Sequence, residues 1–150
     1  MANARIVFLT NPDSTGKVEC LKRLMEDGHA VVAVISTSAV PALAENPLKL
    51  LAKHGALFLA RKVLDKFLAK LKPSELKKFL AETGTPHPTV RDINDDESVA
   101  LIASLEPDIL ITSAFSQILS ERVIALPKLA ALNSHSSLLP KYRGPAPVFW

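Results

Sequence analysis

Residues 5–35 read RIVFLTNPDSTGKVECLKRLMEDGHAVVAVI and contain three segments that differ in hydrophobic periodicity. Arg5–Thr10 is a short run of β-branched and aromatic residues followed by turn-forming residues, so we expect a strand and then a loop. Apolar residues at helical spacing predict a helix over residues 18–27, which Gly28 ends. Residues 30–35 are apolar on both faces, as in a buried strand. This order predicts a parallel sheet with a right-handed crossover, the beginning of a doubly wound α/β fold.

The rest of the chain continues this alternation of strands and helices. In chain order, we expect a proline-interrupted edge strand over residues 85–92, a helix over 95–105 and a buried strand over 108–112. A short loop then leads into a second helix that begins at residue 121, and a last strand covers residues 129–133. The sequence therefore predicts an α/β protein with a mostly parallel, Rossmann-like sheet and helices on both faces. We expect one domain over residues 1–150 that is incomplete at its C-terminal end, with no second domain.

Residues 41–82 interrupt the alternation. Leucine, phenylalanine and valine recur there at helical spacing between lysines and arginines, so we expect a helical insertion of two helices with a break near Pro73 and a serine cap at Ser74. A basic amphipathic helix is able to lie on a membrane surface, but such a segment more often packs its apolar face on its own domain. The insertion either covers the sheet or adapts the fold to an unusual substrate.

The composition is that of an ordinary globular domain. The chain has 150 residues, of which 48% are hydrophobic and 22% charged, which argues against disordered and fibrous classes. The single cysteine, Cys20, excludes an internal disulfide and a zinc-binding thiol cluster, so we expect no metal site and a cytoplasmic location. The N-terminus runs straight into a strand, and we read no secretory signal. The net charge of +3 permits an anionic substrate and identifies none.

Three loops at the carboxyl ends of predicted strands are the candidate ligand sites. They comprise residues 11–14, 113–117 and 133–135, and they converge because ligands bind outside the carboxyl ends of strands in an open α/β sheet. Asn133 and His135 are two residues apart on a strand, so we expect an amide and an imidazole to face one space. Such a pair suits attack on a carbonyl carbon, because both N–H groups stabilise the oxyanion of the tetrahedral intermediate.

Other readings of these features stay open at this point. A lone histidine is more often packed than catalytic, and we expect structural roles for His29, His54 and His87. A nucleotide-binding module without catalysis is compatible with the strand–helix–strand opening, although the first loop, TNPDSTG, lacks G-x-G-x-x-G. A third class is a membrane-surface or partner-binding protein built on the basic insertion.

The run NSHSSLLPKYRGPAPVFW, from Asn133 to Trp150, resembles the signature of the folate-dependent formyltransferase family, whose members carry N-x-H followed by S-L-L-P-x-aromatic-R-G. A weaker similarity covers RIVFLTNPDS and EPDILITSAFSQILSERVIALPKLAALN. The resemblance implies the N-terminal catalytic domain of such an enzyme, which transfers a formyl group from 10-formyl-tetrahydrofolate to an amine acceptor. Methionyl-tRNA, an amino sugar and a small amine are the alternatives for that acceptor, and water as acceptor would make the protein a hydrolase. The sequence leaves the oligomeric state open.

Carried over residue by residue, the resemblance also implies roles for individual side chains. Asn133 and His135 match the family's catalytic pair, with His135 as the charged or proton-donating partner of the oxyanion. The donor-binding residues would be Ser116, Gln117, Ile118, Leu119, Ser137, Leu138, Leu139 and Pro140. Where many members have an aromatic–glycine pair in the first of these segments, this chain has Phe115 and Ser116.

The family's third catalytic residue is an aspartate in a D-x-G context beyond the S-L-L-P loop. The sequence ends at Trp150 before such a segment, so we expect the 150-residue chain alone to be inactive. Asp108 is no substitute, because it stands at the entry of a predicted strand, opposite the crevice.

Overall fold

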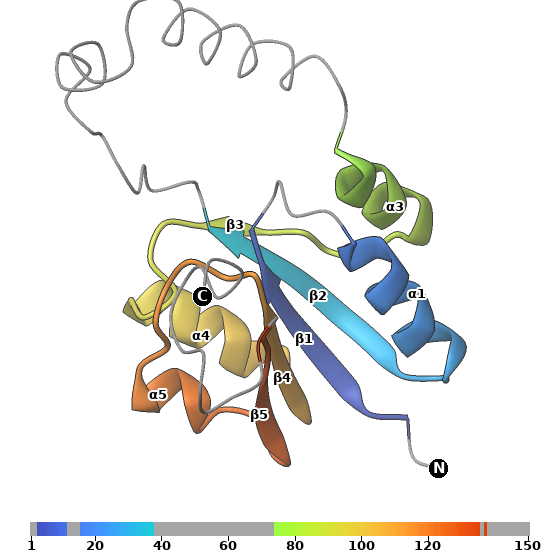
Figure 1. Cartoon of the computed structure of the whole chain (residues 1–150). Coiled ribbons are helices and arrows are strands. Elements are labelled where there is room, and N and C mark those ends of the chain that lie inside the picture. Colours follow the sequence, from blue (N-terminus) through green and yellow to red (C-terminus); the bar gives the residue numbers. More distant parts are fainter. Residues whose placement is uncertain (1–2, 12–15, 38–73, 136, 138–150) are drawn as a thin grey trace, which may run out of the picture.

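The computed structural model describes residues 3–11, 16–37, 74–135 and 137, which form a five-stranded sheet between two layers of helices (Figure 1). In chain order the elements are β1 (Arg5–Thr10), α1 (Lys17–Glu26), β2 (Ala30–Thr37), α3 (Glu75–Thr83), β3 (Thr89–Val90), α4 (Asp96–Ser104), β4 (Ile109–Ser113), α5 (Glu121–Ile124) and β5 (Ala130–Ser134). The strand order is β3-β2-β1-β4-β5, and each neighbouring pair is parallel. The predicted doubly wound α/β fold is thereby confirmed.

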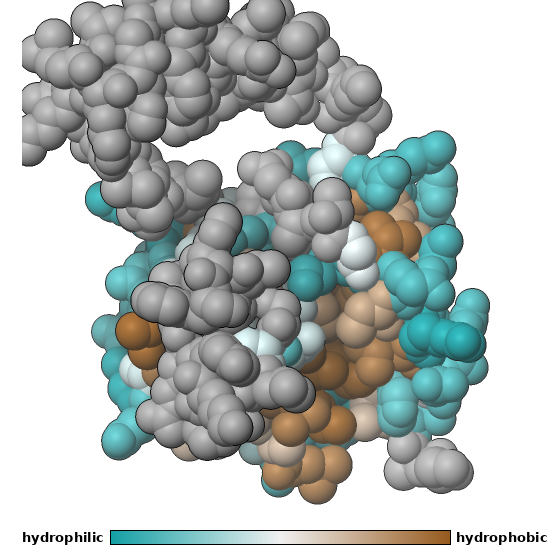
Figure 2. Space-filling model, viewed as in Figure 1, coloured by the Kyte–Doolittle hydropathy of each residue, from teal (hydrophilic) through white to brown (hydrophobic). Residues whose placement is uncertain are grey.

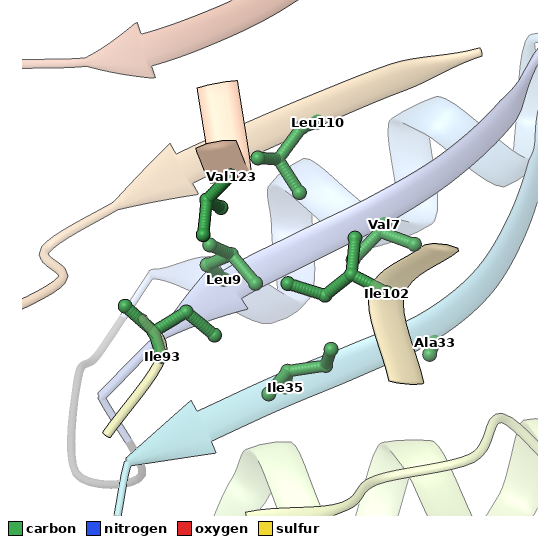
Figure 3. Packing of buried hydrophobic residues seen from close by; sticks show 8 residues of the cluster. All are labelled: Val7, Leu9, Ala33, Ile35, Ile93, Ile102, Leu110 and Val123. Atoms are coloured by element: carbon green, nitrogen blue, oxygen red, sulfur yellow. The ribbon is translucent and has the colours of Figure 1, made fainter. Parts of the chain in front are cut away.

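The central strand β1 divides the core into two clusters, because alternate residues of a strand point to opposite faces. Val7 and Leu9 face α4 and α5, where they pack with Ile102 and Val123 (Figure 3). Phe8 points to the other face, which α1 and α3 cover. The members of this second cluster are Phe8, Leu21, Val34, Leu76 and Leu80. Helices therefore cover both faces of the sheet, as predicted.

The edge strand β3 is shorter than the predicted segment of residues 85–92, and prolines are the reason. Pro86 and Pro88 have no N–H to donate, but their carbonyl oxygens accept hydrogen bonds from the backbone nitrogens of Val34, at 2.9 Å, and Ser36, at 3.1 Å. The two prolines therefore accept hydrogen bonds from β2 but donate none to it, and regular strand pairing is limited to Thr89–Val90.

Strand β2 is longer than predicted, because its polar end is buried. Ser36 and Thr37 are each 1% exposed. The hydroxyl of Ser36 lies 3.1 Å from Nε2 of His87, so this buried polar group has a hydrogen-bond partner. The sequence pattern alone would place Ser36 in a loop. Burial, with a smaller contribution from the positive charge of Lys77, lowers the pKa of His87. A structural role for His87 agrees with this position.

The helix boundaries follow from local caps. Asp95 begins α4 by accepting a hydrogen bond from the backbone nitrogen of Ser98 at 2.7 Å, and this bond lowers the pKa of Asp95. Helix α3 begins after Ser74, at the predicted position, but the side chain of Ser74 makes no capping hydrogen bond, so the predicted serine cap is wrong in this respect. The helix ends at Gly84, whose φ of 66° suits glycine. The predicted helix from residue 121 is confirmed but is only four residues long. The predicted first helix of the insertion lies outside the described residues.

Arg5 and Asp108 link the amino-terminal ends of β1 and β4. The carboxylate of Asp108 accepts a hydrogen bond from the backbone nitrogen of Arg5 at 2.8 Å. The guanidinium of Arg5 donates to the carbonyl oxygens of Leu105, at 2.8 Å, and Glu106, at 3.3 Å. Asp108 thus holds the beginnings of β1 and β4 together, at the end of the sheet opposite the candidate loops.

Strand β5 forms the second edge of the described sheet and exposes apolar side chains. Leu132 of β5 is 50% exposed, and Leu129, which immediately precedes the strand, is 73% exposed. Figure 2 shows hydrophobic surface beside α1 and over the lower ends of β4 and β5. Within the described part of the chain, no helix is long and apolar enough to cross a membrane.

Replacing Ile102 by alanine should lower the free energy of unfolding by about 2–5 kcal/mol, because the change removes fully buried atoms and leaves a cavity between α4 and the sheet. The matched control Ile118→Ala removes the same atoms from a side chain that is 91% exposed, and should cost less than about 0.5 kcal/mol. Urea unfolding followed by circular dichroism measures both values. Equal losses in the two variants would contradict the assigned core.

We also expect the 150-residue chain to self-associate through the edge of β5, because exposed apolar strand edges pair with other chains. Leu129→Lys should shift the equilibrium toward the monomer, and Ala103→Lys on the exposed face of α4 should not. Sedimentation velocity over a concentration series reports the association. A wild-type chain that stays monomeric throughout would refute this expectation.

Candidate functional site

The carboxyl ends of β4 and β5 lie side by side. Thr112 of β4 pairs with Asn133 of β5, and Ser113 pairs with Ser134. After β4 the chain reverses at Ala114, whose φ of 48° is a left-handed conformation that costs a non-glycine residue about 1–2 kcal/mol. Strain of this kind at a strand end often accompanies a functional site.

The ends of β4 and β5, the segment after Ala114 and one residue of α5 line a partly open cavity of about 370 Å³. This volume suits a small organic group, and the wall has the composition of a ligand pocket, mainly apolar with few polar groups. Its lining residues are Thr112, Phe115, Gln117, Ile118, Leu119, Ile124, Ala131, Leu132 and Asn133. The cavity therefore lies where the topology of an open α/β sheet predicts a ligand site.

Asn133 lines the cavity, and a neighbouring strand orients its side chain. Its Oδ1 accepts a hydrogen bond from the hydroxyl of Thr112 at 2.8 Å. The oxygen of this amide is bonded to Thr112, and the other polar atom of the side chain is the nitrogen, which carries two N–H donors. Both residues belong to paired strands, so the position of this amide is set by the sheet.

His135 follows the last residue of β5 and is half-buried. Its Nδ1 lies 2.7 Å from the hydroxyl oxygen of Ser137. In the neutral tautomer in which Nδ1 accepts from that hydroxyl, the ring proton is on Nε2, which is then the donor of the imidazole. The structure thus brings His135 and Ser137 together, although neither lines the cavity that Asn133 borders.

Three of the four residues of the segment 116–119 line the cavity, and the fourth contacts β2. Gln117, Ile118 and Leu119 line the cavity, whereas the hydroxyl of Ser116 lies 3.4 Å from that of Thr37 at the end of β2. The amide of Gln117 accepts a hydrogen bond from the backbone nitrogen of Ile93 at 2.7 Å through Oε1. It also donates to the carbonyl oxygen of Arg91 at 2.8 Å through Nε2, so both of its ends bond the chain itself. Of the other predicted donor-binding residues, Leu138, Leu139 and Pro140 lie outside the described residues.

The first candidate loop begins at Asn11, directly after β1, and Lys17 lies beyond it at the beginning of α1. Of residues 11–14, only Asn11 is described. Lys17, in the first turn of α1, donates from Nζ to the hydroxyl oxygen of Ser113 at 2.5 Å. This bond joins the beginning of α1 to the end of β4, which agrees with the predicted convergence of the loops.

Several cavity residues were missed as site residues by sequence reasoning. Ala131 stands two residues before Asn133 on the same strand, so period-2 spacing could have identified it. The pairing of Thr112 with Asn133 depends on sheet register, which the sequence does not display. Ile124 belongs to a four-residue helix, too short for a periodic pattern. Within the described ranges, no group of three or more histidine, cysteine or acidic side chains is arranged to hold a metal ion.

Comparison with solved structures gives the same architecture. Glycinamide ribonucleotide transformylase 1 from Symbiobacterium toebii superposes with a TM-score of 0.61 and 16% identity, over 97% of this chain and 57% of that chain. Phosphoribosylglycinamide formyltransferase from Brucella melitensis has a TM-score of 0.58 and 21% identity, over 95% of this chain and 62% of that chain. At these identities the likeness concerns the fold alone.

Sequence relatives are closer. The methionyl-tRNA formyltransferase of Clostridioides difficile is 32% identical over 146 residues, which are 97% of this chain and 39% of the relative. That of Kosmotoga olearia is 34% identical over 144 residues, 96% of this chain and 38% of the relative. The chain thus spans about two fifths of the length of these curated relatives.

The family model described as formyl transferase matches residues 4–150, nearly the whole chain. This match confirms the resemblance that the N-x-H and S-L-L-P segments predicted. On the strength of this coverage, the chain belongs to the formyl transferase family.

Proposed function

We propose that this chain binds the donor and polarises the formyl group in an enzyme that transfers a formyl group from 10-formyl-tetrahydrofolate to an amine. The observation that carries the proposal is the cavity at the ends of β4 and β5, with the amide of Asn133 on its wall. Membership in the formyl transferase family supports the reaction class. Residues 1–150 would be the N-terminal part of the catalytic domain of a cytoplasmic enzyme.

The volume and the mainly apolar lining of the cavity are compatible with a heteroaromatic group such as the pterin ring of the donor. Phe115 and Leu119 supply apolar contact for such a ring. The backbone of residues 116–119 supplies N–H and C=O groups for its polar edge. Among the predicted donor-binding residues, Ile118 and Leu119 would contribute side chains, Ser137 would hold the catalytic histidine, and the other predicted positions would complete the pocket.

The proposed reaction begins when a neutral amine attacks the formyl carbon. Negative charge then develops on the formyl oxygen, and N–H donors from Asn133 and His135 stabilise it. When the intermediate collapses, the bond from carbon to N10 of tetrahydrofolate breaks, N10 gains a proton and the acceptor nitrogen loses one. The aspartate that the family uses in this proton transfer has no counterpart in the 150 residues, so we propose that this chain alone does not turn over.

Methionyl-tRNA is the acceptor that we favour, because the curated relatives quoted above carry that name. An amino sugar or a small amine is the alternative, and the similar solved structures are named as a glycinamide ribonucleotide transformylase and a phosphoribosylglycinamide formyltransferase. A hydrolase that uses water, or a folate-binding module without catalysis, is the second candidate function.

Filling the cavity should abolish donor binding. Ala131→Phe places a ring in the cavity, so it should weaken binding of 5-formyl-tetrahydrofolate, a stable isomer of the donor, by at least about tenfold. Ala103→Phe makes the same substitution on an exposed position of α4 and should leave the affinity unchanged. Isothermal calorimetry measures both. Failure of the wild-type chain to bind, or equal binding by both variants, would refute the donor site.

In a complete catalytic domain, Asn133→Ala and His135→Ala should each reduce kcat about 10²- to 10³-fold, because each removes one oxyanion donor. Thr112→Val should cause a smaller loss, since Asn133 stays but its amide is no longer oriented, and Thr112→Ser should restore the rate. Single-turnover formyl transfer measures these effects. Full activity in either alanine variant would show that the catalytic pair is wrongly assigned.

A further inference from the structure

Two side-chain amides join the loop between β3 and α4 to the segment 115–120. The amide of Asn94 donates through Nδ2 to the carbonyl oxygen of Ile118 at 3.0 Å and accepts at Oδ1 from the backbone nitrogen of Ser120 at 2.7 Å. Gln117 belongs to the segment 115–120, and its amide bonds the backbone of Arg91 and Ile93 in the loop between β3 and α4. Four hydrogen bonds thus link two loops that are 24 to 26 residues apart in sequence.

The position of Asn94 is itself fixed. Its backbone nitrogen donates to Oδ1 of Asp92 at 2.9 Å, which forms a local turn. The hydroxyl of Ser98, which is 3% exposed at the beginning of α4, donates to the carbonyl oxygen of Asp92 at 2.7 Å. The amide of Asn94 therefore projects from a turn that is anchored to the first turn of a packed helix.

Side-chain packing cannot hold the segment 117–120 at Ile118, because that side chain is 91% exposed. The backbone there is held instead by Asn94, which bonds the carbonyl of Ile118 and the nitrogen of Ser120 on the two sides of Leu119. Ile118 and Leu119 are both walls of the cavity. A rotation of this backbone would move both walls and every polar group that the segment offers to a ligand.

We infer that Asn94 is a positioning residue for the donor site: it holds residues 118–120 in the conformation that the donor binds, while Gln117 secures the same segment from the other side. The inference rests on the proposed function, because the proposed donor defines what the cavity binds. Asn94 does not line the cavity, so its effect on binding passes through the backbone of its two partners.

Substitutions at Asn94 separate the two hydrogen bonds. Asn94→Ala removes both bonds, and Asn94→Asp keeps an acceptor for Ser120 but loses the donor to Ile118. The control is Asp96→Asn, which weakens the ion pair of Asp96 with Arg122. That ion pair also joins α4 to α5, at 2.9 Å, but its side chains are 88% and 63% exposed, so it contributes little.

Two measurements on the 150-residue chain test the inference. Amide hydrogen exchange by NMR should show faster exchange at Ser120 in Asn94→Ala, by about tenfold, whereas the amide of Ile93 should keep its protection through Gln117. Calorimetry should show a dissociation constant for 5-formyl-tetrahydrofolate about tenfold higher in Asn94→Ala, an intermediate value in Asn94→Asp, and no change in Asp96→Asn.

The outcomes distinguish this inference from the proposed function. If the wild-type chain binds the folate and Asn94→Ala binds it equally well, the positioning role is refuted and the donor site stands. If the wild-type chain does not bind the folate, the donor site is refuted and the role of Asn94 in it falls too. In that case the exchange rate at Ser120 still shows whether Asn94 holds the segment, so the two failures are not confused.

Discussion

The structure depends on the burial of β1 along both faces and both edges. Its residues 6–9 are at most 1% exposed, and its backbone pairs with β2 on one side and β4 on the other. A parallel neighbour on each edge requires a crossover through a helix, and the uniform hand of such crossovers sends the two halves of the chain to opposite faces. Helices α1 and α3 therefore cover one face and α4 and α5 the other. The order in which the strands are added reverses between β1 and β4, and such a switch point leaves a crevice at the carboxyl ends of the strands, where the candidate site lies.

Much of this fold could be predicted from the sequence, because the main elements carry their own periodicity. The apolar runs of β1 and β4 and the helical spacing of α1 and α4 are local features, and the structure differs from the predicted bounds by about one residue. The deviations occur where tertiary partners decide. Strand β2 continues through Ser36 because a histidine from another segment satisfies its hydroxyl, and β3 is short because prolines donate nothing.

The candidate site was predictable to a smaller extent. The positions of Asn133 and His135 follow from a strand and its carboxyl end, and the structure places both there. The partners that orient them, Thr112 and Ser137, differ in this respect. Ser137 is two residues away in sequence, whereas Thr112 meets Asn133 only through the register of two strands. Gln117 was predicted from the family resemblance as a donor-binding residue. The structure places it on the wall of the cavity and also uses its amide to bond the backbone of a neighbouring loop, a partner that the sequence does not display.

The two halves of the site are therefore held by different forces. The amide of Asn133 is oriented by the hydroxyl of Thr112 and by the pairing of β5 with β4. The segment 117–120 packs Leu119 against the core, exposes Ile118, and is bonded to the neighbouring loop by Asn94 and Gln117. Each such bond contributes only about 0.5–1.5 kcal/mol, so the loss of one should loosen the segment locally without unfolding the sheet. A substitution of either amide can therefore change the wall of the cavity while the amide of Asn133 stays in place.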